Sequence, residues 1–454
     1  MQKRMTSYGL TLTILCLSLI LSAGLLTACG ETAASELAQK SYDYLLEVEL
    51  LPEDTREIIE KRYNATAVSW RPEAGFAVLG VYEQEISSLH LGADPNRNTV
   101  IAPEFTMDSA AFWAGKYRAW SSGWTAWTDG RRATTFEENL ATWDQIRLPQ
   151  ARALSPNGGA GVKVAVIDTG IDLYHPAFIG KFTAANEWKD FVDGDRFPQD
   201  ERGFRGYNAG YGHGTAIAGI IVQVAPNVSL LPIRALTPEG SGDLSHVIAA
   251  LDWAVEQDAD IINLSLGTND NYDTLQRIVD YTLDKEVYIV ASSGNSGDTR
   301  VTYPAAKSDT GNGNRKNWFI GVGSVDKYDR KSPFSTYGDN LELVAPGEDI
   351  YTVAPGRKRM SVSGTSAAAA VVSGALALGL ALEYDAADEY TKLAEHINSA
   401  AVDVSYYNPD IKLGFGRIDV REYLEKAQPL NNYNPPGNGG DDDDDDGDDD
   451  DDDD

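Results

Sequence analysis

The sequence predicts an α/β fold in which a central parallel sheet lies between layers of helices, preceded by a small α+β domain. Short apolar runs with little alternation recur after about residue 143, and helical segments separate several of them. Such runs are typical of strands that are buried on both faces of a parallel sheet. The predicted strands are 162–167, 230–235, 261–266, 287–291 and 319–322, and the clearest helices between them are 244–257 and 273–284.

A strand–helix–strand pattern predicts the smaller α+β domain within residues 29–87. Residues 44–51 form a predicted strand, and Pro52-Glu53-Asp54-Thr55 opens a helix that runs to about Tyr63. Residues 66–82 hold one or two further strands. An unrelated α+β adaptor domain is the alternative interpretation.

The next segment and the C-terminal tail carry little regular pattern. Residues 88–142 are rich in tryptophan, which predicts an insertion that packs on a neighbouring domain, with carbohydrate binding as the alternative. The tryptophans concerned are Trp113, Trp120, Trp124 and Trp127. Residues 431–454 end in a run of aspartates from Asp441, and like charges at that density are expected to leave this tail disordered.

The whole chain is strongly acidic, with 69 Asp and Glu residues against 38 Lys and Arg residues and a net charge of -31. Phosphate backbones would repel a protein of this charge. We therefore expect no nucleic-acid partner.

The N-terminus predicts export. Lys3 and Arg4 precede an apolar stretch that ends at Leu26-Thr27-Ala28-Cys29. This ending resembles the bacterial lipobox, in which the cysteine becomes the lipidated first residue of the mature protein. The resemblance implies that residues 1–28 are a signal peptide and that Cys29 holds the chain on a bacterial membrane, facing the periplasm or the cell surface. A plain cleaved signal and an uncleaved anchor helix are the alternatives.

Cysteine usage excludes one class of enzyme. The other cysteine, Cys16, lies inside the predicted signal, so the mature body has neither a disulfide nor a thiol nucleophile. A cysteine protease is therefore excluded.

Three short motifs carry the chemistry of nucleophilic catalysis. Val166-Ile167-Asp168-Thr169-Gly170 ends a predicted strand, Gly212-His213-Gly214-Thr215 precedes a small-residue helix, and Gly364-Thr365-Ser366-Ala367 opens another helix. Each alone could be a turn, a tight loop or a capped helix. Together they supply a hydroxyl nucleophile, an imidazole base and a carboxylate that fixes the imidazole's tautomer. A serine at a helix N-terminus also has a backbone N–H suited to a developing oxyanion.

In this order the motifs resemble those of the subtilisin family of serine proteases, the subtilases. The resemblance implies a subtilisin-like three-layer fold and a catalytic domain over residues 143–430. It also implies hydrolysis of peptide bonds through an acyl-enzyme, with Asp168, His213 and Ser366 as the triad. The α+β domain resembles the family's small ferredoxin-like propeptides, which assist folding and plug the active site, so the chain would be a zymogen.

Further segments resemble the family's substrate site. Ser292-Ser293-Gly294-Asn295 resembles the loop whose asparagine supplies the second oxyanion donor, a role that falls to Asn295. Gly240-Ser241-Gly242 and Ser265-Leu266-Gly267 resemble the two segments that pair with the substrate as extra strands. Thr302 falls at the floor of the primary pocket, where a small uncharged residue favours apolar or medium-sized substrate side chains.

Two departures from the family pattern leave the triad intact. Ala216 stands where a histidine is usual, and Ala367, Ala370 and Val371 stand where Met, Pro and His are usual. None of the replaced residues carries a proton in the mechanism.

An acidic loop before His213 suggests a metal site. Asp193, Asp195 and Asp200 lie close together in the sequence, near Asp190 and Glu201. Oxygen ligands on a loop suit Ca²⁺, and related proteases bind it in this region, so we predict a structural calcium there. A solvated acidic loop is the alternative, and the chemistry itself requires no cofactor.

The expected function is that of an extracytoplasmic serine endopeptidase, a monomer acting on polypeptide substrates. Two alternatives remain open at this point. One is a catalytically silent surface binding protein on a subtilisin scaffold, against which the intact triad argues. The other is a maturase that cuts a single partner.

Overall fold

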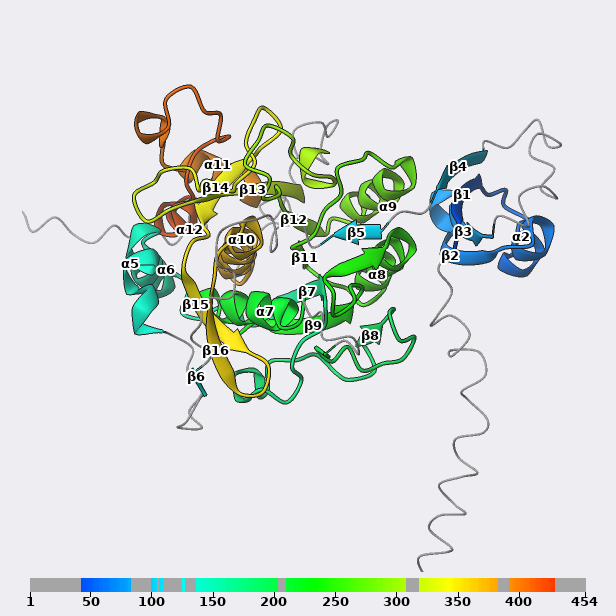
Figure 1. Ribbon diagram of the computed structural model, residues 1–454, viewed down its shortest axis with the longest axis horizontal. Helices are drawn as coiled ribbons and strands as arrows, with labels where there is room; N and C mark the ends of the chain where they lie inside the picture. The colour runs from blue at the N-terminus through cyan, green and yellow to red at the C-terminus, as the bar shows by residue number, and fades with distance from the viewer. Residues whose placement is uncertain are drawn as a thin grey trace, which may run out of the picture.

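The computed structural model describes residues 42–82, 99–103, 106–108, 125–126, 136–202, 210–307, 318–382 and 392–428. They form a small N-terminal unit, residues 42–82 and 99–103, and a larger main unit from residue 136 onward (Figure 1). The predicted signal peptide, Cys29, the four tryptophans named above and the aspartate tail lie outside the described residues.

The main unit is built on a parallel sheet of seven strands in the order β14-β13-β12-β11-β7-β9-β8. Every residue of the central strands β11, β12 and β13 is buried, which is why their sequences are apolar without alternation. The strands are β7 (Lys163–Asp168), β8 (Lys189–Asp190), β9 (Ser229–Arg234), β11 (Ile261–Leu264), β12 (Tyr288–Ser292), β13 (Phe319–Val325) and β14 (Leu343–Pro346).

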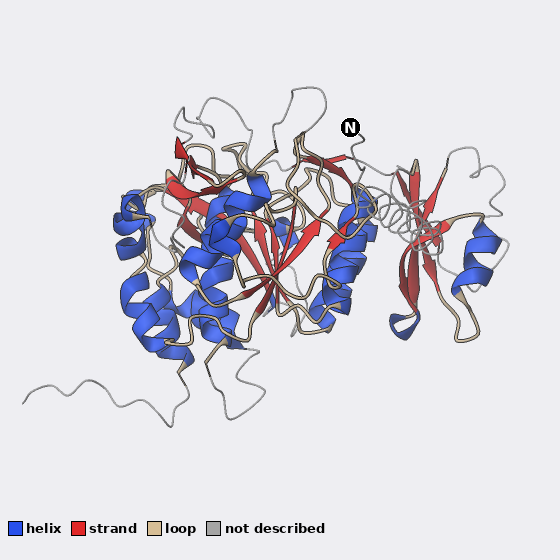
Figure 2. Cartoon of the chain, turned by 90° about the horizontal axis from the view of Figure 1, so that it is seen from below, coloured by secondary structure: helices blue, strands red, loops and turns tan. Residues whose placement is uncertain are grey.

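Helices cover both faces of this sheet, so the predicted three-layer α/β fold is confirmed (Figure 2). Helices α7 and α10 pack against each other on one side, and α8 and α9 pack together on the other. The helices are α5 (Leu140–Gln145), α6 (Leu148–Leu154), α7 (His213–Val224), α8 (Leu244–Glu256), α9 (Asp273–Asp284), α10 (Thr365–Leu380), α11 (Leu393–Ala400) and α12 (Val420–Ala427). Within the described ranges, none of them combines the length and the apolar character that crossing a bilayer requires.

Two smaller sheets lie beside the main one. One has the strand order β15-β16-β6, and the other is a two-stranded pair of β10 and β5. Their bounds are β15 (Ile350–Ala354), β16 (Lys358–Val362), β6 (Thr125–Ala126), β10 (Ser241–Asp243) and β5 (Thr106–Asp108).

The N-terminal unit is a four-stranded antiparallel sheet in the order β2-β3-β1-β4 with one helix. Its elements are β1 (Tyr44–Glu49), α2 (Arg56–Tyr63), β2 (Thr66–Arg71), β3 (Phe76–Val81) and β4 (Thr99–Pro103). The sheet extends past the domain boundary predicted at residue 87, because β4 pairs with β1 across a long stretch of sequence. A five-residue segment is too short for its hydrophobic pattern to identify it as a strand.

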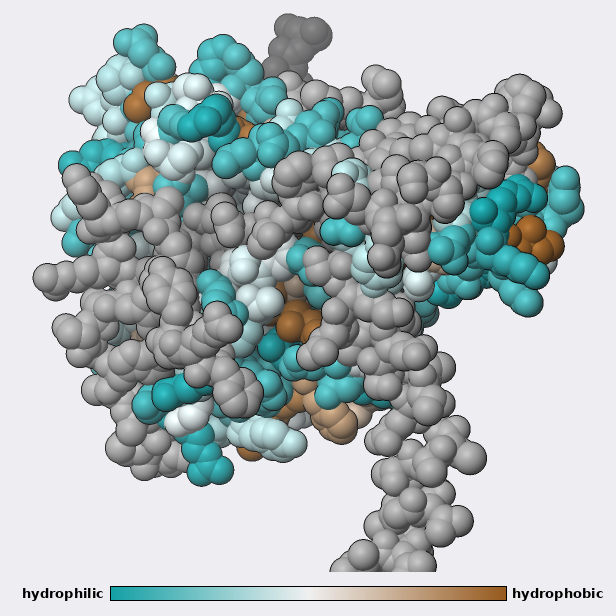
Figure 3. All heavy atoms as spheres, turned by 45° about the vertical axis from the view of Figure 1, so that its right-hand side comes forward, coloured by the Kyte–Doolittle hydropathy of each residue, from teal (hydrophilic) through white to brown (hydrophobic). Residues whose placement is uncertain are grey.

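Successive side chains of β1 point to opposite faces of this sheet, and the two faces pack against different parts of the protein. Leu46 and Val48 pack with Ile59 of α2, whereas Leu45 joins the core of the main unit. Phe76 and Val78 of β3 also join that core. One face of the small sheet therefore lies against the main unit, while the unit's described outer surface is largely hydrophilic (Figure 3).

Candidate active site

The candidate catalytic residues gather at the carboxyl ends of the parallel strands, where open α/β sheets place their ligands. Asp168 is the last residue of β7, and Asn295 follows the end of β12. His213 is the first residue of α7 and Ser366 the second residue of α10. The fold thus brings four distant segments to one edge of the sheet.

Asp168 and His213 are in direct contact. The His213 Nδ1 atom lies 2.7 Å from Asp168 Oδ1, and both side chains are fully buried. The carboxylate holds the Nδ1 proton and so leaves Nε2 as the basic atom of the neutral ring. Thr169 joins the two segments, because its N–H donates to Asp168 Oδ1 and its Oγ1 accepts from the N–H of Gly214.

Close packing explains the glycine beside the histidine. A Cβ at Gly214 would collide with the carbonyl oxygen of Gly170 and lie 3.0 Å from the Cβ of Asp168. A glycine is therefore required where α7 begins against the end of β7. The same contact brings His213 within reach of Asp168.

Asp200 anchors the start of α7, a role that sequence reasoning missed. Its Oδ1 accepts from the N–H of Gly212 at 2.9 Å, and its Oδ2 accepts from Thr215 Oγ1 at 2.5 Å. Burial, together with a smaller contribution from the charge of Asp168, raises the pKa of Asp200 to about 8, although the hydrogen bonds from Thr215 and Gly212 oppose the rise.

In the described residues, the carboxylates for which a structural calcium was predicted bind other groups of the protein. Asp200 faces α7, while Asp190 and Asp193 bind the buried guanidinium of Arg234 at 2.8 and 2.5 Å. Asp195 Oδ1 accepts a backbone N–H from Phe197. The described part of the chain contains no group of three or more His, Cys, Asp and Glu residues placed to hold a metal. Arg234 thus supplies a positive charge beside Asp190 and Asp193.

Asn295 and Ser366 are connected through Thr365. The N–H and Oγ1 of Thr365 both donate to Asn295 Oδ1, at 3.0 and 2.9 Å. Because this oxygen is held by two donors, the amide is oriented with its Nδ2 as the donor on the other side. Ser366 lies in the first turn of α10, where backbone N–H groups have no partner within the helix. Its Oγ donates to the carbonyl of Ser265 at 3.3 Å.

Parts of the predicted substrate segments lie close to one another and to these residues. Leu266 and Gly267 continue from Ser265 at the end of β11, and Thr302 lies beside Gly267. Ser241 and Gly242 form β10, which pairs antiparallel with β5 in the register Ser241 to Asp108 and Gly242 to Met107. A strand of the chain itself therefore lies where the family resemblance places the substrate.

The direction of β5 follows from the residues around β10. Gly240 precedes β10 and packs closely against Gly210. A Cβ atom added to Gly210 would lie 2.5 Å from the Cα atom of Gly240. The carbonyl of Gly210 accepts from the N–H of His213 at 2.9 Å. Since β5 is antiparallel to β10, it runs along β10 from Asp243 to Ser241, the end that adjoins Gly240.

The N-terminal unit contacts α8 through a buried ion pair and α9 through an aromatic ring. Arg71 of β2 binds Asp252 and, at 2.9 Å, Glu256, both on α8. Burial raises the pKa of Asp252 to about 6, and the Arg71 guanidinium opposes that rise. Arg71 also lies over the ring of Tyr281, whose hydroxyl donates to Glu73 at 2.8 Å.

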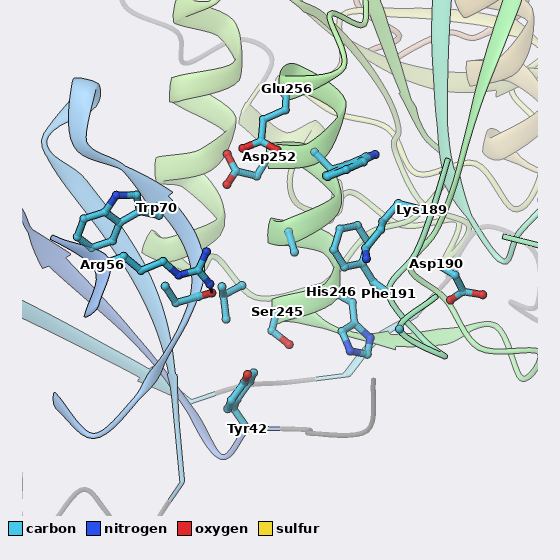
Figure 4. A pocket seen from close by; sticks show the side chains of 15 residues that line it. Tyr42, Arg56, Trp70, Lys189, Asp190, Phe191, Ser245, His246, Asp252 and Glu256 are labelled. Atoms are coloured by element: carbon cyan, nitrogen blue, oxygen red, sulfur yellow. Dashed lines mark hydrogen bonds between the residues drawn. The ribbon is translucent and has the colours of Figure 1, made fainter. Parts of the chain in front are cut away.

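A pocket of about 360 Å³ lies beside this contact (Figure 4). Arg56 and Trp70 of the N-terminal unit lie on one side of it, and Ser245 and His246 of α8 lie on the other. The two units are therefore in contact along α8, with a gap at the edge of the interface.

Comparison with known proteins gives one consistent result. Residues 159–416 match the model of the Subtilase family. Thermitase of Thermoactinomyces vulgaris is 38% identical over 244 residues, which are 52% of this chain and 79% of that protein. The thermophilic serine proteinase of Bacillus sp. (strain AK1) is 38% identical over 231 residues, 49% of this chain and 52% of that protein. The intracellular serine protease of Paenibacillus polymyxa is 36% identical over 252 residues, 52% of this chain and 69% of that protein.

Proposed function

Because the chain belongs to the subtilase family of serine endopeptidases, we propose that it is an exported protease that is made as a precursor and cuts its own N-terminal unit away. The contact between His213 Nδ1 and Asp168 Oδ1, at the strand edge that also carries Ser366 and Asn295, is the observation that supports this proposal most directly. The substrates are polypeptides, and the chemistry requires no cofactor.

The reaction follows from the positions of these groups. Ser366 Oγ attacks the scissile carbonyl carbon while His213 Nε2 takes the hydroxyl proton. Asn295 Nδ2 and the Ser366 N–H stabilise the oxyanion of the tetrahedral intermediate. When the C–N bond breaks, His213 gives the proton to the leaving amine and an acyl-enzyme remains. A water molecule, deprotonated by His213, then attacks the carbonyl carbon of the acyl-enzyme. The bond to Ser366 Oγ breaks, His213 returns the proton to that oxygen, and the acid product leaves.

Strand β5 supports the precursor part of the proposal. It pairs antiparallel with β10, a segment that the family resemblance assigns to substrate binding, and it runs toward the Ser241 end of β10. The first substrate of each molecule would therefore be its own chain, just after β5. Incubating the full chain and determining the new N-terminus tests this, and a stable, uncut, active protein would contradict self-processing.

Export and lipidation are proposed from the N-terminal sequence alone, since the relatives include a protease named as intracellular. A charged start, an apolar middle and Leu26-Thr27-Ala28-Cys29 direct the chain to a bacterial lipoprotein pathway. Cys29 would then carry the lipid, so cutting after β5 would separate the protease from its anchor.

Replacing Asn295 with alanine is expected to lower kcat by about 10²- to 10³-fold with little change in KM. The Nδ2 donor acts on the oxyanion, which exists only in the transition state and intermediate, and removing such a donor in subtilisin has a cost of that size. The measurement is steady-state hydrolysis of a peptide amide by the processed enzyme.

Ser296→Ala is the matched control for this prediction. Ser296 adjoins Asn295, but its hydroxyl donates to the exposed Asp298. The control should keep the activity of the parent chain. A loss of less than tenfold in Asn295→Ala would remove Asn295 from the oxyanion site.

Replacing Arg71 with alanine is expected to weaken the hold of the main unit on the cut N-terminal unit by about 10²- to 10³-fold. The change leaves Asp252 buried without its cation, and breaking a buried pair from one side costs about 3–5 kcal/mol. After self-cleavage, the fraction of the N-terminal fragment that co-elutes with the protease on size exclusion gives the measurement.

Two further variants complete this test. Asp252→Asn should act in the same direction from the other side of the interface. Arg62→Ala removes a half-exposed arginine of the same unit that pairs with Asp54, and it should leave co-elution unchanged. Equal co-elution in Arg71→Ala and the parent would show that this ion pair does not hold the two units together.

A further inference from the structure

We propose that the pocket between the N-terminal unit and α8 binds a small aromatic carboxylate, and that this ligand holds the two units together. Binding itself is independent of the proposed function. Its consequence for maturation rests on that function, because only a chain that cuts itself has an N-terminal unit to release.

The pocket has the size and the lining of a small-molecule site. Its volume of about 360 Å³ lies within the range of roughly 300–1,000 Å³ that is usual for such sites. Both units contribute aromatic side chains to it, Tyr42 and Trp70 from the N-terminal unit and Phe191 and Trp253 from the main unit. Aromatic surfaces on both units favour a ligand with a planar apolar body.

The carboxylates that line the pocket are already bound by arginines of the protein. Asp252 and Glu256 both bind Arg71, and Asp190 binds Arg234 at 2.8 Å. A cationic ligand would therefore compete with two arginines that are tethered beside their partners. The arginines also offset the negative charge that an anionic ligand would meet.

Lys189 provides donors that the protein itself does not use. Its ammonium lies 5.5 Å from the centre of the Phe191 ring and 5.9 Å from that of Trp253, and it has no hydrogen bond or ion pair within the described part of the chain. Burial lowers the pKa of this half-buried lysine. A carboxylate in the pocket would supply the missing acceptor and stabilise the charged form of the lysine.

His246 provides a second polar atom on the same side. Its Nδ1 atom is buried and has no hydrogen-bond partner among the described residues. Burial lowers the pKa of its imidazole, so the ring is neutral at pH 7 and can present an N–H to a carboxylate. His246 and Lys189 lie across the pocket from Arg56 and Trp70, so a ligand bound between them contacts both units (Figure 4).

The binding test uses the full-length Ser366→Ala chain, in which the two units stay joined. The probe is 3-phenylpropionate, and 3-phenylpropanamide has the same body without the charge. Isothermal titration calorimetry should give the acid a Kd of about 0.1 mM, which is within reach of a ligand of this size. The amide should bind at least tenfold more weakly, because it brings no charge to Lys189.

One lysine variant and one control test the assigned contact. Lys189→Met keeps the length of the side chain and removes its charge, so it should weaken the acid at least tenfold and leave the amide unchanged. Lys327 also lies over an aromatic ring, 5.1 Å from the centre of Tyr328, but outside the pocket, so Lys327→Met should bind the acid like the parent. No binding of the acid, equal affinity for acid and amide, or unchanged affinity in Lys189→Met would overturn the site. The comparison of acid and amide decides the question even where Lys189→Met does not fold.

The second test measures release of the cut N-terminal unit. A ligand that binds only while the two units are together stabilises their complex, so the acid at ten times its Kd should tighten retention of the fragment about tenfold. Size exclusion of the self-processed parent with and without the acid measures this. Unchanged retention with intact binding would overturn the coupling of the ligand to the interface. A chain that binds the acid but never cuts itself would overturn the proposed function and support the site.

Discussion

Replacing Ser366 with alanine is expected to lower kcat by about 10⁶-fold and to leave the full-length chain uncut. Removing the nucleophile eliminates the covalent pathway, and only the oxyanion donors and substrate binding remain, as the loss of that size in subtilisin illustrates. Intact-mass analysis with a fluorophosphonate probe measures both effects at once, because labelling and self-cleavage change the mass in opposite directions.

Ser363→Ala is the matched control for this experiment. Ser363 lies three residues before the nucleophile and accepts the N–H of Asp349 at 2.9 Å. This variant should be labelled and should cut itself like the parent. Cutting by a Ser366→Ala chain would indicate another nucleophile, whereas a folded parent chain without labelling would favour a silent binding scaffold.

Replacing Asp168 with asparagine is expected to slow self-cleavage by about 10⁴-fold while the chain remains folded. An amide at this position donates to His213 Nδ1, so the ring is held in the tautomer whose Nε2 carries a proton and cannot accept one from Ser366. A time course of self-cleavage measures the effect, and circular dichroism shows whether the variant folds.

Asp172→Asn provides the comparison for Asp168→Asn. Asp172 is also a buried carboxylate, but it accepts the N–H groups of Tyr174 and Gly356 instead of contacting His213. Its replacement should slow self-cleavage by less than about tenfold. Similar rates for the two variants would mean that Asp168 acts on stability alone.

The sequence was sufficient to predict the parallel sheet and its helices. Strands such as β11 and β12 are buried on both faces, so their composition alone reveals them. Helices α8 and α9 were also predicted nearly to the residue, because each alternates a buried face with a polar one. The motifs around Asp168 and His213 contain glycines because the backbone there packs too closely for a Cβ atom, so the close contacts are visible in the sequence itself.

Contacts between segments that are far apart in the chain could not be predicted from the sequence pattern. The pairing of β5 with β10 joins three residues on each side, and neither strand has a pattern that identifies the other. The same limit applies to the partners of the acidic loop. A run of acidic residues has the same appearance whether the carboxylates bind a cation, an arginine or backbone N–H groups. Arg234, which binds Asp190 and Asp193, lies 44 and 41 residues from them in the sequence, and Asp200 instead accepts from Gly212 and Thr215.

The pairing of β5 with β10 has a kinetic consequence. Since both strands belong to one chain, the internal segment is present at the site at an effective concentration on the order of millimolar. A substrate in solution at micromolar concentration is outcompeted about a thousandfold until the internal bond is cut. Self-processing as proposed would be a unimolecular event, so we expect its half-life not to change when the protein is diluted.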